Sequence, residues 1–275
     1  MRWLLGLVLI CIAGISAASN LDLLGRIERA ILYPFDSTRT HPSDVGLTEV
    51  TEATWQRDGV ELILWHVPPK SGKPTIVYFH GNAGNLAARA GRFKLFREQG
   101  FGLIALSPRG AGGSGGVPTE SSLSSDASDL LRSLTDWQPK IDAKNIVLYG
   151  ESLGTGIAIS AIQQSGIVPA GLILEAPYTS IVAVAAANEQ IPDSLLARIS
   201  DTWDSLSRTK VLTMPLLVVH GTQDALIPFS QGKELHDAAP STRKKMLAVS
   251  GAGHADLWRS NVIAEIMAFA RNLIR

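Results

Sequence analysis

The stretch NIVLYGESLGTGIAISAIQQSG, residues 145–166, decides how this chain folds. It begins with a short apolar run rich in β-branched residues, as expected for a buried strand. The tight turn GESLG follows at once at residues 150–154, and an apolar helical pattern with small residues on one face continues to Gln164. A serine at the apex between strand and helix is the context that a nucleophile elbow requires, and it points to Ser152.

The glycines of this turn have a physical role. Gly150 and Gly154 lack side chains at the place where the strand and helix backbones must pass very close to each other. The turn is then expected to hold Ser152 in a strained backbone conformation, with its hydroxyl above the sheet edge. The amide of Leu153 lies at the start of the helix, where it can donate to a developing oxyanion with help from the helix dipole.

A second run, GGSGG at residues 112–116, also fits the G-x-S-x-G pattern. No strand leads directly into it, and Val117-Pro118 follows in place of a helix. The overlapping run GAGGSG at residues 110–115 fits the dinucleotide fingerprint, but no helix opens on its third glycine. We therefore interpret this region as a flexible glycine loop, and the context selects Ser152.

Composition excludes several classes of function. The 275 residues suit a single α/β domain, and 25 basic residues balance 25 acidic ones, which gives no electrostatic case for nucleic acid as a partner. The single cysteine, Cys11, rules out an internal disulfide framework. No Cys/His group has zinc spacing, so a metal site has no support in the sequence.

The N-terminus has the pattern of an export signal. Arg2 precedes an unbroken apolar run from Trp3 to Ala18 that ends in small residues. We predict that residues 1–18 form a signal peptide or an uncleaved membrane anchor, with the body exported and either membrane-anchored or free in an extracytoplasmic compartment. Residues 19–45 should form an amphipathic linker, with a helix over Asn20–Leu32.

The remaining residues, 46–275, read as one domain. Alternating runs at Thr48–Trp55 and Val60–Val67 flank an Asp-Gly pair and predict a β-hairpin. From Thr75 onward, apolar strands alternate with amphipathic helices, which predicts a mostly parallel sheet of about eight strands covered by helices on both faces. Further strands are expected at 75–79, 102–106, 145–149, 171–174, 216–219 and 245–249, and helices at 86–99, 122–137, 153–164, 230–238 and 257–274. The helical segment Ser180–Lys210 breaks this rhythm and predicts a small cap insertion, about residues 180–210.

A serine nucleophile needs a base to take its proton and an acid to orient that base. His254 is the best candidate base, because the glycine-rich loop SGAGHAD at residues 250–256 follows the last strand and so lies on the same sheet edge as Ser152. Asp224 is the preferred acid, in a turn directly after a buried strand. Glu175, at the end of the preceding strand, is the rival.

The segment HGNAGN at residues 80–85 follows the first central strand, where this kind of fold places a second oxyanion donor. We assign the amide of Asn82 to that role, with Ala83 as the neighbouring possibility. Asn85 is expected to cap the next helix. His80 is expected to brace the loop through hydrogen bonds and to take no part in chemistry.

The segments described so far, around Ser152, around His254 and at residues 80–85, resemble those of the α/β-hydrolase superfamily. The branch they most resemble holds N-terminally anchored serine hydrolases, which include depalmitoylating enzymes, lysophospholipid hydrolases and serine aminopeptidase-like members. Two departures are Ala111, where an aromatic residue is usual, and Ser107-Pro108, which replace the usual lead-in; both can alter a pocket wall or its loop packing. The matching blocks are HGNAGN from 80, RGAGGSGGVPTE from 109, GESLG from 150, APYTS from 176, HGTQDALIP from 220 and GAGH from 251.

The resemblance implies acyl transfer through an acyl-enzyme. Together with the candidate residues it predicts a serine hydrolase that cleaves an ester or thioester, with an acyl-chain or lipid-like substrate at or near a membrane. Two alternatives remain, a peptidase of the same fold and a non-catalytic membrane-tethered binding domain; a dinucleotide enzyme is a distant third. The apolar residues of the cap would form a wall for the acyl chain, or would only pack the cap onto the sheet.

Overall fold

The computed structural model describes residues 17–139, 141–188 and 191–274. The chain divides into two compact units, of which the first ends at Pro34 and the second spans Phe35–Arg275. The first contains helix α2, Ala17–Leu32, which matches the helix predicted over Asn20–Leu32. The predicted signal or anchor lies outside the described residues except for its last two. Within the described ranges, no helix is both long enough and apolar enough to cross a membrane.

The second unit is built on a sheet of eight strands in the order β1-β2-β4-β3-β5-β6-β7-β8, which confirms the predicted α/β fold. Strands β1, β2 and β4 pair antiparallel at one side of the sheet, and every other neighbouring pair is parallel. The strands are β1 Thr51–Arg57, β2 Val60–Val67, β3 Thr75–Phe79, β4 Gly102–Leu106, β5 Ile146–Glu151, β6 Gly171–Glu175, β7 Leu216–Gly221 and β8 Lys244–Val249.

Local turn chemistry explains the hairpin at the sheet edge. Asp58 and Gly59, between β1 and β2, both have positive φ angles, of 48° and 73°. A two-residue turn with positive φ at both positions matches the twist of the strands it joins, and Asp-Gly is a preferred pair for it. The prediction of a hairpin at this place is therefore confirmed, with β1 starting at Thr51, later than the expected Thr48.

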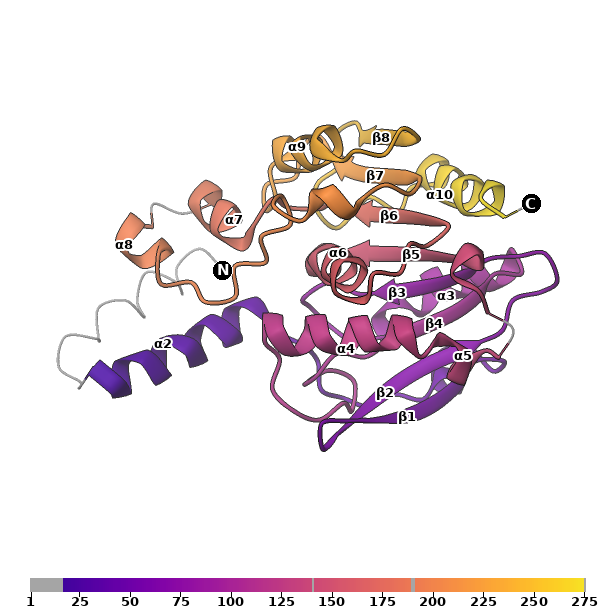
Figure 1. Cartoon of the computed structure of the whole chain (residues 1–275), viewed down its shortest axis with the longest axis horizontal. Helices are drawn as coiled ribbons and strands as arrows, with labels where there is room; N and C mark the ends of the chain where they lie inside the picture. Colours follow the sequence, from indigo (N-terminus) through magenta and orange to yellow (C-terminus); the bar gives the residue numbers. More distant parts are fainter. Residues whose placement is uncertain (1–16, 140, 189–190, 275) are drawn as a thin grey trace. The chain divides into compact units, whose positions relative to one another are not determined.

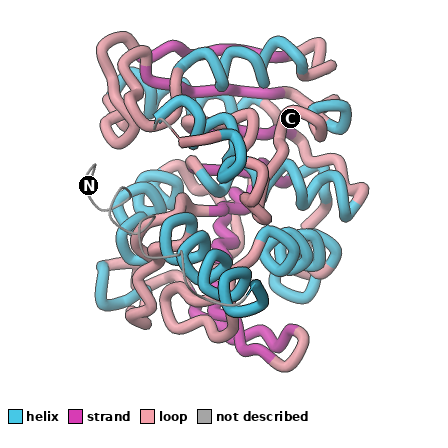
Figure 2. Tube along the Cα trace, turned by 90° about the vertical axis from the view of Figure 1, so that its left-hand side faces the viewer, coloured by secondary structure: helices cyan, strands magenta, loops and turns pink. Residues whose placement is uncertain are grey.

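Helices cover both faces of the sheet, as predicted. Figure 1 shows α4 and α6 in front of the sheet and α3 behind it, and Figure 2 gives the view turned by 90°. Apolar side chains of α3 and α10 share one buried cluster with alternate residues of β3, β5 and β7. The helices are α3 Ala90–Glu98, α4 Glu120–Arg132, α5 Leu134–Trp137, α6 Leu153–Ser165, α7 Ile181–Asn188, α8 Asp193–Leu196, α9 Phe229–Ala238 and α10 Ser260–Asn272, with 3-10 turns η1 Pro42–Val45, η2 Ala87–Arg89, η3 Ala143–Asn145 and η4 Thr209–Val211.

The insertion between β6 and β7 is helical, as expected for the segment Ser180–Lys210, and holds α7, α8 and η4. A backbone hydrogen bond of 2.8 Å from the Ile181 amide to the Thr202 carbonyl closes its base. The carboxylate of Glu120, in α4, accepts a hydrogen bond of 2.6 Å from the Trp203 amide. The two ends of the insertion are thus fixed to each other and to the helix layer.

The glycine loop between β4 and α4 is less loose than its composition suggests. The hydroxyl of Ser114 donates to the Ser107 carbonyl and accepts from the Ile63 amide, each at 2.8 Å. Ser114 itself is buried, with 6% of its surface exposed. We expected a flexible loop; hydrogen bonds to β2 instead hold it in place, and its serine hydroxyl is fully engaged.

Residues 35–38, at the start of the second unit, are hydrogen-bonded to the loop after β3. Phe35 forms a parallel bridge with Gly84, and the Asp36 amide donates to the Gly84 carbonyl at 3.1 Å. The side-chain amide of Asn85 donates to the Asp36 carboxylate at 3.0 Å and to the Thr38 carbonyl at 3.1 Å. The compact unit therefore includes the chain from Phe35, whereas we expected the domain to begin at residue 46.

The direction of the chain across the sheet reverses between β3 and β5. From β3 the chain moves outward to β4 on one side, and from β5 it moves outward through β6, β7 and β8 on the other. The connections leaving the carboxyl ends of β3 and β5 turn away from each other, and ligands of open α/β sheets generally bind at such a point. Ser152 and the 80–85 segment both lie at this point.

Candidate active site

The elbow is strained in the way its glycines predict. Ser152 has φ 50° and ψ −116°, a conformation rare for a residue with a side chain. A Cβ atom on Gly154 would lie 2.0 Å from the Phe79 carbonyl oxygen, and one on Gly150 would lie 2.6 Å from the Gly154 carbonyl oxygen. Only glycine fits at either position, because the backbones of β3, β5 and α6 occupy the space.

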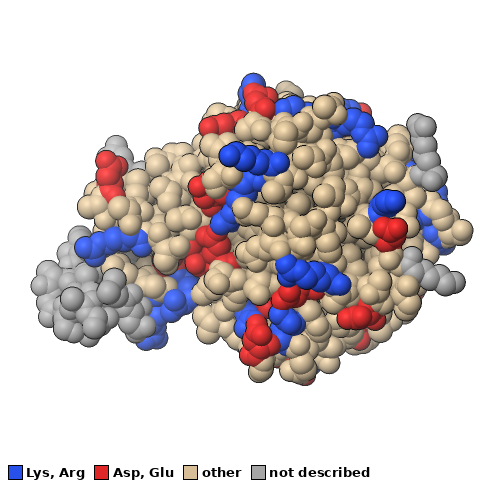
Figure 3. Space-filling model, viewed as in Figure 1, with Lys and Arg blue, Asp and Glu red and all other residues tan. Residues whose placement is uncertain are grey.

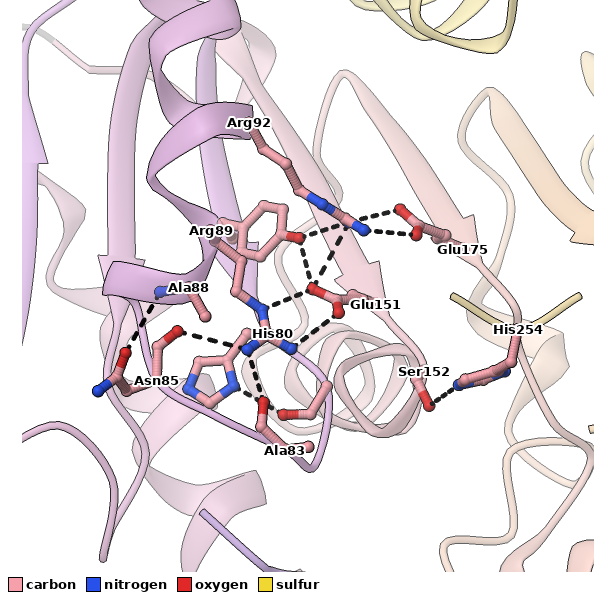
Figure 4. Close-up of polar contacts among 12 residues, drawn as sticks. His80, Ala83, Asn85, Ala88, Arg89, Arg92, Glu151, Ser152, Glu175 and His254 are labelled. Atoms are coloured by element: carbon pink, nitrogen blue, oxygen red, sulfur yellow. Dashed lines mark hydrogen bonds and ion pairs between the residues drawn. The ribbon is translucent and has the colours of Figure 1, made fainter. Parts of the chain in front are cut away.

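Three residues far apart in sequence meet at the sheet's carboxyl edge. The His254 Nε2 atom lies 3.0 Å from the Ser152 Oγ atom, and the His254 Nδ1 atom lies 2.8 Å from the Asp224 Oδ2 atom. Ser152 follows β5, Asp224 follows β7 and His254 follows β8. Figure 4 shows the side chains of Ser152 and His254 pointing toward each other.

The carboxylate of Asp224 fixes the tautomer of the histidine. A carboxylate only accepts hydrogen bonds, so the proton of the neutral imidazole lies on Nδ1 of His254. Nε2 is then an acceptor, placed to receive the proton of the Ser152 hydroxyl. The arrangement can move a proton from serine to imidazole while the carboxylate stabilises the imidazolium that forms.

Backbone amides hold the Asp224 carboxylate in place. Its Oδ1 atom accepts hydrogen bonds from the amides of Leu226 and Ile227, each 2.9 Å long. Burial by itself would raise the pKa of the Asp224 carboxyl, but hydrogen bonds from His220 and His254 outweigh that effect and hold the pKa below its usual range. Asp224 is therefore ionised at neutral pH and has both oxygens occupied.

Glu175, the rival acid, has other partners. Its carboxylate accepts two hydrogen bonds from the guanidinium of Arg92, at 2.8 and 3.0 Å. The Trp258 indole donates to it at 2.8 Å, and the Tyr149 hydroxyl donates to it as well. Glu175 is buried in this group, while the histidine Nδ1 atom is paired with Asp224.

The two segments expected to supply the oxyanion donors both lie next to Ser152. Leu153 opens α6, and no side chain caps that end of the helix. A Cβ atom on Gly81 would lie 3.4 Å from the Ser152 Cβ atom, so the residue next to Asn82 passes directly beside the serine. We call residues 81–85 the 81–85 loop. The structure thus brings both predicted segments to the serine.

His80 braces this loop, as predicted. Its Nδ1 atom lies 2.7 Å from the Gly81 carbonyl oxygen, which can only accept. In a trans peptide the carbonyl and the next amide point in opposite directions, so this hydrogen bond also fixes the direction of the Asn82 N–H. Burial, helped by the nearby Arg89 charge, lowers the pKa of His80 to about 4, and the ring is neutral at pH 7. Asn85 accepts a hydrogen bond from the Ala88 amide at 3.3 Å, as expected for a cap.

Sequence reasoning missed a group of charged residues behind the elbow. Arg89 forms an ion pair with Glu151 and Arg92 forms one with Glu175, at 2.8 Å in each case. Figure 4 shows both arginines pointing toward the strand ends that flank Ser152. The sequence hints at this group only through Glu151, the second residue of GESLG, and no local pattern indicates that Arg89 is its partner.

Nothing in the described ranges suggests a metal centre, since no three His, Cys, Asp or Glu side chains there are grouped to hold an ion. The surface charges also fit the neutral balance of the sequence. On the face shown in Figure 3, basic and acidic side chains are interspersed and form no continuous basic surface. That face therefore offers no electrostatic footprint for nucleic acid.

Comparison with known proteins decides the family. The model of the serine aminopeptidase S33 family matches residues 70–206. An uncharacterized protein of Mycobacterium tuberculosis is 30% identical over 262 residues, which cover 91% of this chain and 88% of that protein. The lysophosphatidylserine lipase ABHD12 of Danio rerio is 26% identical over 281 residues, with 88% and 72% covered. The chain belongs to the α/β-hydrolase superfamily.

Solved structures of other α/β hydrolases share the fold. An esterase of Pyrococcus furiosus superposes with a TM-score of 0.73 at 19% identity, covering 88% of this chain and 98% of that one. An alpha-beta hydrolase of Vibrio vulnificus has a TM-score of 0.72 at 20% identity, with 93% and 95% covered. At these identities the likeness concerns the fold, and substrate preference has to be argued from the residues of this chain.

Proposed function

We propose that this α/β hydrolase is a serine hydrolase that cleaves a carboxylic ester or thioester through an acyl-enzyme. The observation that carries the proposal is the hydrogen-bonded chain from Ser152 through His254 to Asp224, with lengths of 3.0 and 2.8 Å. Hydrolase relatives named as a lipase and an esterase also support it. No cofactor is needed, because the nucleophile, base and acid are all side chains of this chain.

In the proposed reaction, His254 Nε2 takes the proton of the Ser152 hydroxyl as the oxygen attacks the substrate carbonyl. The tetrahedral oxyanion is stabilised by the amides of Leu153 and Asn82, and His254 then gives the proton to the leaving alcohol or thiol. Water repeats the sequence on the acyl-enzyme and releases the acid. Asp224 remains ionised throughout and stabilises the imidazolium.

The aliphatic side chains of the cap support the proposal that the enzyme recognises its substrate by an acyl chain. Its large aliphatic side chains are half-buried and none is fully enclosed, so they retain surface that a ligand can cover. The competing interpretation is that they only pack the cap onto the sheet, and the substrate series described next separates the two. The residues concerned are Ile181, Val182, Val184, Ile191, Leu195, Leu196 and Ile199.

An acyl-chain series tests this proposal. With p-nitrophenyl esters in detergent-free buffer, kcat/KM should rise as the acyl chain lengthens from acetyl to octanoyl. Each methylene that becomes buried contributes up to about 0.8 kcal/mol, which amounts to a few-fold in kcat/KM until the pocket is full. Leu195→Asp, in the cap and remote from the elbow in sequence, should abolish the rise while leaving acetyl ester hydrolysis within about two-fold.

A steady decline beyond propionyl would contradict a chain-binding wall and favour a short-chain esterase. The family match by a serine aminopeptidase model keeps a peptidase as the second candidate. Aminoacyl p-nitroanilides in the same panel separate the two, because a peptidase should hydrolyse the amide bond at a measurable rate, whereas an esterase should leave it intact.

We also propose that residues 1–18 direct export and that the domain works outside the cytoplasm, attached to or near a membrane. The apolar run behind Arg2 supports this, as does α2, whose amphipathic pattern suits a lipid surface. In the proposed organisation the linker expected over residues 19–45 ends earlier, because the hydrolase unit already begins at Phe35.

A fusion of residues 1–40 to alkaline phosphatase, which is active only after export, should give an active reporter in bacterial cells. Leu7→Asp in the same fusion should silence the reporter, because a charge in the centre of a short apolar run costs about 2.5–3.5 kcal/mol on insertion scales. An inactive, soluble fusion with the natural residues would refute export.

A further inference from the structure

One guanidinium group joins the 81–85 loop to the nucleophile elbow. The Nε and Nη2 atoms of Arg89 donate to the Glu151 carboxylate at 3.1 and 2.8 Å. Its Nη1 atom donates to the Ala83 carbonyl at 2.5 Å and lies 3.4 Å from the Asn85 carbonyl. Figure 4 shows the Arg89 side chain between these partners. Since Glu151 directly precedes Ser152, this side chain spans the gap between the loop and the serine.

The 81–85 loop leaves room for the Arg89 guanidinium because it has glycine at position 84. Gly84 has a φ angle of 74°, and a Cβ atom there would lie 2.8 Å from the Arg89 Nη1 atom. A side chain at that position would therefore displace the guanidinium. On the other side, a Cβ atom on Gly81 would lie 3.3 Å from the Glu151 Oε1 atom. The loop backbone thus lies against both members of the ion pair.

Glu151 is held from a second direction as well. The Tyr78 hydroxyl donates to its Oε2 atom at 2.7 Å, and the Arg92 Nη1 atom lies 3.6 Å from the same oxygen. Burial opposes the charge of Glu151, but Arg92 and Arg89 outweigh that effect and lower the pKa of the carboxyl to about 2. The carboxylate is therefore ionised, and its hydrogen bonds leave it one orientation.

The neighbouring ion pair secures the other side of the elbow. Arg92 is bound to Glu175, and the backbone amide of Ser152 donates to the Glu175 carbonyl at 2.8 Å. The elbow is therefore attached to β6 through its backbone and to the 81–85 loop through Glu151. Of these attachments, the Arg89–Glu151 pair is the one that also contacts the loop carrying the Asn82 amide.

We propose that Arg89 and Glu151 are positioning residues that set the distance between the Asn82 amide and the Ser152 hydroxyl, and so assemble the oxyanion hole. This inference rests on the proposed hydrolase function. A buried ion pair contributes little net stability compared with apolar residues of the same size, so its expected effect lies in geometry. An error of about 1 Å in the placement of a catalytic group can cost about 100-fold in rate.

The test compares Arg89→Lys and Glu151→Gln with Arg109→Lys. Lysine has one nitrogen in place of the three with which Arg89 binds the carboxylate and the Ala83 carbonyl, so it loses their fixed geometry. Glutamine keeps the size of Glu151 and removes its charge. Arg109 is a matched control, because it makes a largely buried two-bond pair with Asp126, at 2.7 and 2.8 Å. Its other side-chain partner is Asp58, at 3.4 Å, and neither carboxylate belongs to the 81–85 loop. Four quantities are measured for each protein: the melting temperature, kcat and KM for a p-nitrophenyl ester, and the inhibition constant of an aryl trifluoromethyl ketone.

The ketone forms a tetrahedral adduct with a serine and places an oxyanion in the hole, so it reports directly on the assembled donors. We expect Arg89→Lys to lower kcat about 10- to 100-fold and to raise the inhibition constant of the ketone by a similar factor. Its KM should stay within about two-fold of that of the natural protein. Glu151→Gln should have a smaller effect of the same kind. Arg109→Lys should lower the melting temperature by an amount comparable to that in Arg89→Lys. Its kcat and its affinity for the ketone should stay within about two-fold of those of the natural protein.

A lower melting temperature in Arg89→Lys with kcat and ketone affinity near those of the natural protein would overturn the proposal, because the pair would then be purely structural. Equal losses of kcat in Arg89→Lys and Arg109→Lys would overturn it too. If Arg89→Lys does not fold, Glu151→Gln decides alone by the same criteria. Failure of the hydrolase function itself would look different, since the natural protein would neither turn over esters nor react with the ketone.

Discussion

Replacing Ser152 with alanine should abolish covalent labelling by a fluorophosphonate and lower kcat by about 10⁶-fold, the magnitude found for serine nucleophiles of other hydrolases. The hydroxyl is the only group at the elbow that can form the acyl-enzyme, and His254 has nothing to deprotonate without it. Intact-mass spectrometry of the natural protein should show a single adduct, and peptide mapping should place it on Ser152.

Ser114→Ala is the matched control, because Ser114 occupies the other G-x-S-x-G run and its hydroxyl is bonded to β2 and to Ser107. This variant should keep full labelling. An adduct on Ser114, or unchanged labelling of Ser152→Ala, would refute the assignment of the nucleophile. Absence of any adduct on a folded natural protein would favour the non-catalytic binding domain.

Asp224→Asn should lower kcat by about 10⁴-fold, as the corresponding change does in other triads. The carboxylate accepts the Nδ1 proton of His254 at 2.8 Å, whereas an asparagine amide can turn its NH₂ group toward that nitrogen. The proton then moves to Nε2, which can no longer accept from Ser152. Steady-state kinetics with the best p-nitrophenyl ester measures the loss, and circular dichroism checks that the variant is folded.

Glu175→Gln serves as the comparison, since Glu175 is the other acid that sequence suggested. Its carboxylate is bonded to Arg92, Trp258 and Tyr149, so its replacement should act mainly on stability and cost kcat far less than Asp224→Asn. If Glu175→Gln proved the more damaging change to kcat, Glu175 would have to be the orienting acid.

The sequence alone was sufficient to predict those features whose physical cause lies within a short stretch of chain. The elbow could be predicted because strand, turn and helix follow one another within residues 145–166, and the glycines at 150 and 154 leave few other conformations. The hairpin at Asp58-Gly59 and the parallel strands follow from the same kind of short-range pattern. Because the carboxyl ends of parallel strands share one edge, the order Ser152, Asp224, His254 also predicts which loops meet.

Long-range side-chain contacts could not be predicted. Arg89 and Glu151 are 62 positions apart, and a helical arginine looks the same in sequence whether it faces solvent or a buried carboxylate. Ser114 was expected in a flexible loop because glycines dominate the run, while the hydrogen bond that holds it comes from Ile63 in another strand. The start of the compact unit at Phe35 likewise depends on a bridge to Gly84, which no local pattern reports.

That bridge has a practical consequence for anyone who wishes to prepare the hydrolase without its N-terminal segment. A truncation placed just ahead of the first strand, which begins at Thr51, would discard Phe35, Asp36 and Thr38 and leave Gly84 and Asn85 without these partners. The shortened protein would keep its whole sheet, yet the turn bearing Asn82 would have lost its outer support. We therefore expect the shortest piece that keeps the geometry of the candidate site to start no later than Phe35, well before the first residue that the sheet itself requires.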